Sequence, residues 1–172
     1  NLTLIANDTA MPDRGYGKLF ASGQIKKVIC SYMGLNPTAI AQKLDGTIEA
    51  ELAPQGTLAE RVRAGGSGLG GILTPTGVGT IVEEGKSKLE IGGRVYLVEL
   101  PLRADVALIN AAIADHAGNL VYRKSARNFN PLMAMAADYV VAQAAKVQAV
   151  GEIDPDHVMT PGVVVDAVVE VN

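Results

Sequence analysis

Short apolar runs alternate with helical segments along this 172-residue sequence, and this alternation constrains the fold more than any other feature. Parallel strands need long crossover connections, which are usually helices that cover the faces of the sheet. The pattern therefore predicts an α/β fold, an open and mostly parallel sheet with helices on both faces. Six runs have strand character: residues 2–6, 27–33, 48–53, 106–112, 139–147 and 163–171.

The segments between these runs carry helix signals. Two of them begin with Asn-Pro, at Asn36-Pro37 and Asn130-Pro131, where asparagine suits the cap and proline suits the first turn. A third helix is expected from Thr57 onward, in the sequence TLAERVRAGG. A β-hairpin interrupts the alternation, because two alternating runs flank Gly92-Gly93, a pair suited to a two-residue turn. No linker divides the chain, so we expect a single domain over residues 1–172.

Composition excludes several functions. The 15 basic and 18 acidic residues give a net charge of −3 and are scattered, so we expect no nucleic-acid partner. No stretch has the roughly 18 apolar residues of a membrane span, and the single Cys30 cannot form a disulfide framework. These features predict a soluble cytoplasmic protein. The chain opens on Asn1 in a strand-like run, so we expect that its true beginning is missing.

Polar residues that follow the predicted strands are candidates for a site. Gln55 follows the run 48–53 after Pro54, at the carboxyl end of a strand, where ligands bind in α/β sheets. Its amide either donates into that crevice or bonds the local backbone as a turn residue. Asn7 and Asp8 end the first run in the same way, and residues of this type also close turns.

Glycines crowd residues 65–71, but this run lacks the G-x-x-x-x-G-K-[ST] phosphate signature and follows a helix instead of opening one. Close packing of the backbone and close approach of a ligand both remain open as explanations. His116 and His157 stand in turn-like settings without metal-ligand spacing, so no metal site is expected. The segment RKSARN, residues 123–128, either binds an anion or caps the next helix.

Several phrases in a fixed order resemble one known family: ANDTA, APQGTLAERVRAGG, LTPTGVGT, EEGK, LPLRADVALINA, AGNLVYRKSARNFNP and TPGVVVD. Together they look like the α subunit of the 3-oxoacid (acetate or acetoacetate) family of coenzyme A transferases. The resemblance implies an open α/β sheet and an active site between two related subunits. It also implies that the chain lacks its first strand–helix unit, which in this family leads into Gly-Gly-Phe.

The resemblance implies a ping-pong exchange of CoA between an acyl-CoA and acetate, butyrate, acetoacetate or succinate. Gln55 matches the oxyanion donor of the family and Asn7 matches its pocket asparagine, while Gly65, Gly66 and Gly68 are candidates for the approach of substrate or CoA. The nucleophilic glutamate of the family lies in a Glu-Asn-Gly motif of the β subunit, and no such motif occurs here. The expected assembly is therefore an α–β hetero-oligomer such as α2β2, with CoA as substrate and no permanently bound cofactor.

Two alternatives keep the fold and change the function. A sugar-phosphate isomerase-like enzyme would use RKSARN as a phosphate clamp, although the chain shows no matching catalytic base. A non-catalytic ligand-sensing domain would need no partner that carries Glu-Asn-Gly.

Overall fold

The computed structural model describes residues 1–171, which form two compact units. Unit 1 comprises Asn1–Leu58 and Leu73–Val98, and unit 2 comprises Ala59–Ile72 and the chain from Glu99 onward. Each unit is described by itself below. The single domain expected from the sequence stays a prediction.

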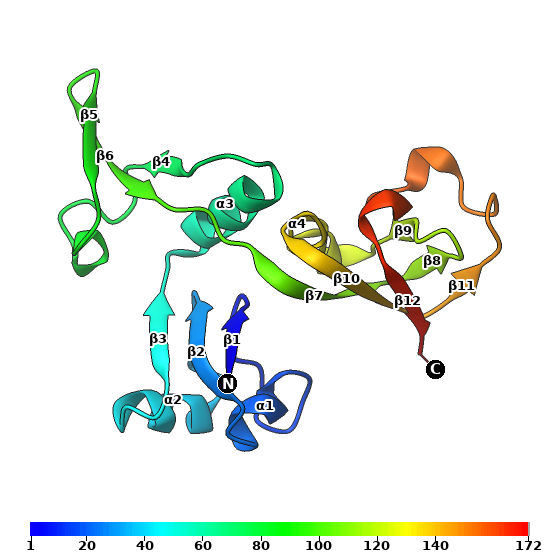
Figure 1. The fold of residues 1–172 in the computed structure, drawn as a ribbon, viewed down its shortest axis with the longest axis horizontal. Coiled ribbons are helices and arrows are strands. Elements are labelled where there is room, and N and C mark those ends of the chain that lie inside the picture. The colour runs from blue at the N-terminus through cyan, green and yellow to red at the C-terminus, as the bar shows by residue number, and fades with distance from the viewer. Residues whose placement is uncertain (172) are drawn as a thin grey trace. The chain divides into compact units, whose positions relative to one another are not determined.

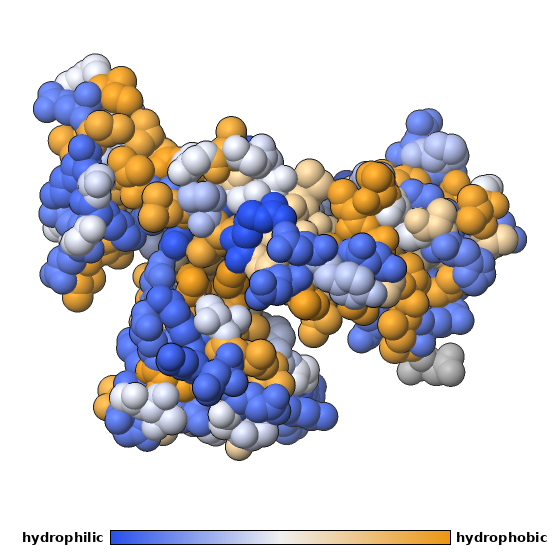
Figure 2. All heavy atoms as spheres, in the orientation of Figure 1, coloured by the Kyte–Doolittle hydropathy of each residue, from blue (hydrophilic) through white to orange (hydrophobic). Residues whose placement is uncertain are grey.

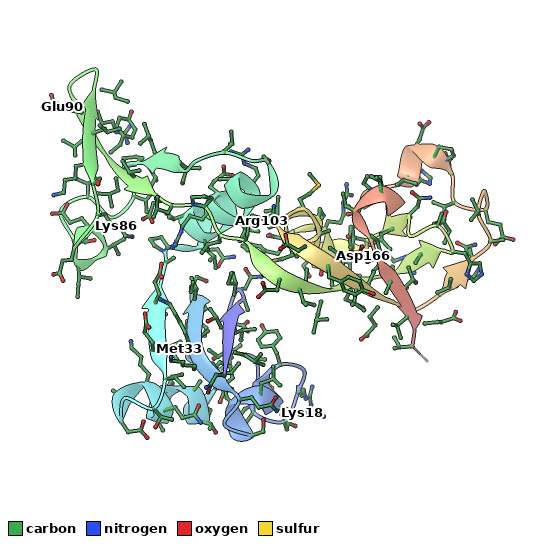
Figure 3. All side chains as sticks on the ribbon, in the orientation of Figure 1. Lys18, Met33, Lys86, Glu90, Arg103 and Asp166 are labelled. Atoms are coloured by element: carbon green, nitrogen blue, oxygen red, sulfur yellow. The ribbon has the colours of Figure 1, made fainter. Side chains whose placement is uncertain are left out.

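Unit 1 contains a three-stranded parallel sheet whose strands are joined by helices (Figure 1). Its elements are β1 (Leu2–Ile5), α1 (Gly17–Ala21), β2 (Ile25–Cys30), α2 (Pro37–Leu44) and β3 (Glu49–Leu52). The strand order is β1-β2-β3, so β2 is central. Phe20, Val28 and Cys30 are completely buried in the core of this unit, and Met33, labelled in Figure 3, packs with them.

Asn36 begins α2 as the sequence predicts. Its side chain accepts a hydrogen bond from Ala39 N at 3.1 Å and donates one to Thr9 O at 3.0 Å. The strand before it is shorter than expected: β2 ends at Cys30 and does not continue to Met33. The chain leaves the sheet there because Met33 O accepts from Asn36 N at 3.1 Å, which closes a turn into the helix cap.

The predicted hairpin is confirmed. Strands β5 (Lys88–Ile91) and β6 (Arg94–Glu99) pair antiparallel, and Gly92 and Gly93 have φ angles of 60° and 76°. These angles match a type I′ turn, whose twist fits the flanking strands. Strand β4 (Ile72–Thr74) lies on the other side of β6, and η1 (Ile81–Glu83) precedes the hairpin. Figure 2 shows apolar residues along the hairpin.

Unit 2 contains a second parallel sheet and a smaller mixed sheet (Figure 1). The parallel sheet has the order β12-β10-β7, and α4 packs against β7 and β10. The elements are β7 (Ala104–Ala111), β8 (Ile113–Asp115), β9 (Leu120–Val121), η2 (Lys124–Arg127), α4 (Asn130–Met135), β10 (Ala137–Ala144), β11 (Val147–Gln148), η3 (Pro155–His157), η4 (Gly162–Val164) and β12 (Ala167–Glu170). Helix α3 (Gln55–Gly66) contributes its later turns to unit 2.

The α/β class with parallel sheets is confirmed, and two local expectations besides the end of β2 need correction. Residues 163–166 are not strand, because η4 forms a turn in which Val165 N donates to Gly162 O at 3.0 Å. Asn130 is not the cap of α4 but its first residue: its Oδ1 accepts from Asn110 N at 3.0 Å and its Nδ2 donates to Ala126 O at 2.9 Å. Within residues 1–171, no helix has the length and apolar character needed to cross a membrane.

Candidate functional site

Three polar residues meet at the carboxyl edge of the unit 1 sheet. Strands β1, β2 and β3 run in the same direction (Figure 1), and each is followed by a short segment that continues the ladder. Ser31 N donates to Asn7 O at 3.0 Å, and Ala53 N donates to Cys30 O at 2.9 Å. This pairing places Asn7, Ser31 and the segment that leads to Gln55 next to one another.

The three residues form a closed set of hydrogen bonds, in which Asn7 takes part through its side chain and its backbone carbonyl. Gln55 Nε2 donates to Asn7 Oδ1 at 2.7 Å, and Ser31 Oγ lies 2.8 Å from Asn7 O. Ser31 Oγ also bonds Gln55 Oε1. Gln55 is exposed, while Asn7 and Ser31 are half-buried. The set therefore faces outward from the edge of the sheet, where a ligand can reach it.

The backbone around Gln55 favours negative charge. Helix α3 begins at Gln55, and Pro54 O accepts the hydrogen bond of Leu58 N at 2.9 Å. The first N–H groups of a helix have no acceptor within the helix and carry the positive end of its dipole. A developing oxyanion near Gln55 would thus meet a side-chain donor and a favourable helix terminus together.

Asp8 follows Asn7 but is already engaged. Its Oδ1 accepts from Ala10 N and from the Tyr16 hydroxyl, both at 2.8 Å. Burial, together with the hydrogen bond and the negative charge of Asp8, raises the pKa of the Tyr16 hydroxyl, which therefore stays protonated as a donor. Asp8 closes the turn after β1, as the sequence analysis expects of asparagine and aspartate residues that follow a strand.

Glu83 and Glu84 lie in the turn that contains η1. Glu83 accepts from Gly79 N at 2.6 Å and pairs with Lys88 Nζ at 2.7 Å. The hydrogen bond from Lys88 is the largest of several effects that hold the pKa of this carboxyl below its usual range. Glu84 is exposed at the end of the same turn. The carboxylate of Glu83 thus has a structural role in its turn.

The glycines predicted to approach a substrate have packing reasons for their size within unit 2. A Cβ on Gly65 would lie 2.0 Å from Leu102 O, and one on Gly66 would lie 2.6 Å from Met135 Cβ. Gly68 has a φ of 69°, which a left-handed turn after α3 requires, and Leu69 N donates to Ala64 O there at 2.9 Å. A binding role for these glycines stays a prediction.

His116 lies in a turn, and His157 ends η3. His116 lines a cavity of about 350 Å³ in unit 2 together with Asp166, labelled in Figure 3, and Glu170. Both carboxylates already accept from the backbone, Asp166 from Val140 N at 2.7 Å and Glu170 from Val147 N at 2.9 Å. Across residues 1–171, no group of three His, Cys, Asp or Glu side chains is placed to hold a metal ion.

The RKSARN segment forms η2 in unit 2. Arg123, Lys124 and Arg127 are all exposed, and Lys124 has a φ of 53°, uncommon for a residue with a side chain. Asn130 Nδ2 ties the segment to α4 through Ala126 O. The exposed charges leave both sequence interpretations, an anion site and a helix lead-in, open.

The sequence analysis missed Ser31. It lay inside the run 27–33, which was expected to be strand throughout. The signal that could have found it is its position: Ser31 is the first polar residue after the buried Cys30, just as Asn7 follows Ala6. Parallel strands bring such residues to one edge of the sheet.

Comparisons with known proteins show what this chain is similar to. The family model described as coenzyme A transferase matches residues 1–171. The chain is 53% identical over 169 residues to the acetate CoA-transferase subunit alpha of Escherichia coli K12, covering 98% of this chain and 77% of that protein. It is 51% identical over 170 residues to the acetoacetyl-CoA:acetate/butyrate CoA transferase alpha subunit of Clostridium acetobutylicum, covering 99% and 78%.

Solved structures extend the likeness to three dimensions. An acyl-CoA transferase from E. coli O157:H7, in a thioester complex with CoA, matches with a TM-score of 0.87 at 26% identity. The match covers 99% of this chain and 37% of that one. Glutaconate coenzyme A-transferase from Acidaminococcus fermentans shares the fold with a TM-score of 0.82 at 22% identity, covering 98% of this chain and 61% of that one.

Proposed function

Because this chain belongs to the coenzyme A transferase family, we propose that it is the α subunit of an enzyme that moves CoA between an acyl-CoA and a short-chain acid. The relatives are named for acetate, for acetoacetyl-CoA with acetate or butyrate, and for succinyl-CoA with a 3-ketoacid. We therefore take carboxylic and 3-oxo acids of this size as the substrates. CoA enters as a substrate and is not permanently bound.

The proposed reaction is a ping-pong exchange. A glutamate carboxylate attacks the thioester carbonyl, the C–S bond breaks, and CoA departs as its thiolate. The product on the enzyme is an acyl-glutamyl anhydride. The thiolate then attacks the glutamyl carbonyl, which gives an enzyme thioester and releases the first acid as its carboxylate. The second acid reverses these steps, and each attack places negative charge on a carbonyl oxygen that needs a hydrogen-bond donor.

This chain supplies the donors in the proposal. The observation that carries this role is the exposed Gln55 amide, bonded to Asn7 at the carboxyl edge of the sheet and next to the N-terminus of α3. Gln55 Nε2 has two N–H groups, and only one is needed for Asn7 Oδ1. The second is free to bind the thioester oxygen as it becomes an oxyanion, with Asn7 Nδ2 as a further donor.

The nucleophile belongs to a partner in this proposal. In the family that this chain resembles, the nucleophilic glutamate lies in a Glu-Asn-Gly sequence of the β subunit, and we propose the same here; these 172 residues contain no such sequence. We propose an α–β hetero-oligomer such as α2β2 in the cytoplasm. No observation favours the isomerase-like or ligand-sensing alternatives over this function.

Replacement of the donor tests the proposal. In the complex with a β subunit, Gln55→Ala should lower kcat by a factor on the order of 10²–10³, which is the usual effect of removing one oxyanion donor. Gln24→Ala is the matched control, because Gln24 is an exposed glutamine of unit 1 whose Nε2 donates to the nearby Ser22 Oγ. Wild-type turnover by Gln55→Ala on a saturating acyl-CoA would remove Gln55 from the site.

A further inference from the structure

We propose that Ser31 is a positioning residue that holds the side-chain amide of Gln55 in place beside Asn7, bound at both of its ends and with one N–H left for the oxyanion. This inference rests on the proposed function, in which Gln55 is the oxyanion donor. Ser31 follows the central strand of the order β1-β2-β3, so it lies between the segments that carry Asn7 and Gln55. Its hydroxyl contacts both of them.

Ser31 itself is held from two sides. Its own N–H donates to Asn7 O at 3.0 Å, and the carbonyl of the preceding Cys30 accepts from Ala53 N at 2.9 Å. Cys30 is completely buried. The backbone that carries the Ser31 hydroxyl is therefore fixed, whereas Gln55 is an exposed side chain with three rotatable bonds.

Counting protons shows what the hydroxyl does. Ser31 Oγ has one proton but lies within hydrogen-bond distance of two oxygens, Asn7 O and Gln55 Oε1. In one arrangement the proton goes to Gln55 Oε1, and Gln55 Nε2 donates to Asn7 Oδ1. In the other, the proton goes to Asn7 O, and the side-chain amides of Gln55 and Asn7 are both turned over. Gln55 Nε2 then donates to Ser31 Oγ, and Asn7 Nδ2 donates to Gln55 Oε1.

The two arrangements share the property that matters for catalysis. In each, Ser31 Oγ bonds one end of the Gln55 amide and Asn7 bonds the other. In each, one N–H of Gln55 and at least one N–H of Asn7 are left over for a ligand. Without the Ser31 oxygen, the amide is held at one end only, by Asn7, whose own amide can also turn over.

Loss of Ser31 Oγ should therefore weaken catalysis through Gln55. A freely rotating amide spends part of its time with its carbonyl oxygen toward the substrate, where it repels an oxyanion. One hydrogen bond of this kind is typically worth about 0.5–1.5 kcal/mol, which corresponds to a decrease in kcat of about 2- to 12-fold. Substrate binding elsewhere is unaffected, so KM should change little.

A nucleophilic role for Ser31 has no support among the described residues. Both hydrogen-bond partners of its hydroxyl are amide oxygens, one from the backbone of Asn7 and one from the side chain of Gln55. An activated serine needs an adjacent base, which neither oxygen provides. Ser31 is thus a positioning residue and not a catalytic one.

A double-mutant cycle in the complex with the β subunit tests the inference. Ser31→Ala, Gln55→Ala and the double variant are compared by kcat and KM, with Ser31→Thr to restore a hydroxyl. The control is Ser87→Ala, an exposed serine of unit 1. We expect Ser31→Ala to lose about 2- to 12-fold in kcat and Ser31→Thr to recover most of it. The double variant should match Gln55→Ala alone, because Ser31 then has no amide to hold.

The outcomes separate this inference from the function beneath it. If Gln55→Ala lowers kcat but Ser31→Ala does not, the positioning role is wrong and the proposed function stands. If the two effects add fully in the double variant, Ser31 acts independently of Gln55 and the inference is likewise wrong. If the Gln55→Ala enzyme has the kcat of the wild type, the proposed function fails and the role of Ser31 fails with it.

Discussion

Replacing Gly65 with alanine tests whether the glycine run serves packing or a ligand. Gly65 lies in the last turn of α3, and Leu102 N donates to Arg61 O one turn earlier at 2.9 Å. Arg103, labelled in Figure 3, donates from Nη1 to Gly65 O at 3.0 Å. A Cβ at this position would lie 2.0 Å from Leu102 O and 2.7 Å from Leu102 C.

The expected cost follows from these distances. Both nearby atoms are backbone, so they cannot rotate away as the end of a side chain would, and overpacking of this kind costs about 1–3 kcal/mol. Alanine regains at most about 1 kcal/mol through its better helix propensity. We therefore expect a net loss of about 2 kcal/mol, near the upper end of the overpacking range because backbone must shift. For a chain of this length, that corresponds to a decrease in Tm of roughly 4–8 °C.

Thermal unfolding followed by circular dichroism measures the effect. Gly70→Ala is the matched control, because a Cβ on Gly70 would have no atom within 4 Å. We expect the control to unfold within about 1 °C of the wild type. A Gly65→Ala protein with wild-type Tm would refute the packing argument, and if it also lost CoA-transferase activity, the glycine would be there for a ligand.

Three further predictions concern unit 2. Glu99→Gln removes a buried negative charge whose Oε2 lies 3.9 Å from Nε of the buried Arg61, and should destabilise the fold by about 3 kcal/mol in urea unfolding. Burial alone would raise the pKa of Asp115, but hydrogen bonds from the Asn119 side chain and from nearby backbone outweigh it and lower that pKa. The ionised Asp115 carboxylate therefore stabilises the folded state fully above the unfolded pKa of about 3.9, and this stabilisation is lost as pH falls through the lower folded pKa. The loss in unfolding free energy caused by Asp115→Asn should therefore shrink from pH 7 toward pH 2. Asn130→Ala removes the acceptor for the β7 backbone and should cost about 1–2 kcal/mol in the same assay, whereas a neutral result would mean that water replaces it.

The sequence correctly predicted the features that depend on a few neighbouring residues, namely a helix cap and a hairpin turn. Asn36 followed by proline caps α2, and Gly92-Gly93 closes the hairpin, because in both places the residue type itself sets the backbone angles or the cap. Strand ends were harder to place. Tyr32 and Met33 continue the apolar run past β2, yet Tyr32 is 55% exposed and Met33 is 7% exposed, which composition does not distinguish.

The assembly of the site depended on contacts far apart in the sequence. Gln55 and Asn7 were each predicted from their place after a strand, but their bond spans 48 positions and follows from strand pairing alone. Ser31 escaped notice because the end of β2 was misplaced by three residues. Asn130 was assigned to its own helix, whereas its side chain bonds the backbone of β7, a contact that no local pattern reveals.

The central claim is that this chain supplies oxyanion donors while a partner supplies the nucleophile. Trapping the covalent intermediate tests it most directly: the complex with a β subunit is incubated with acetoacetyl-CoA, treated with borohydride to reduce an enzyme thioester, and mapped by mass spectrometry. The account predicts a reduced glutamate in the β subunit and none in this chain, whether the chain is alone or in the complex. Reduction of Glu84, or of any other glutamate in these 172 residues, would contradict it.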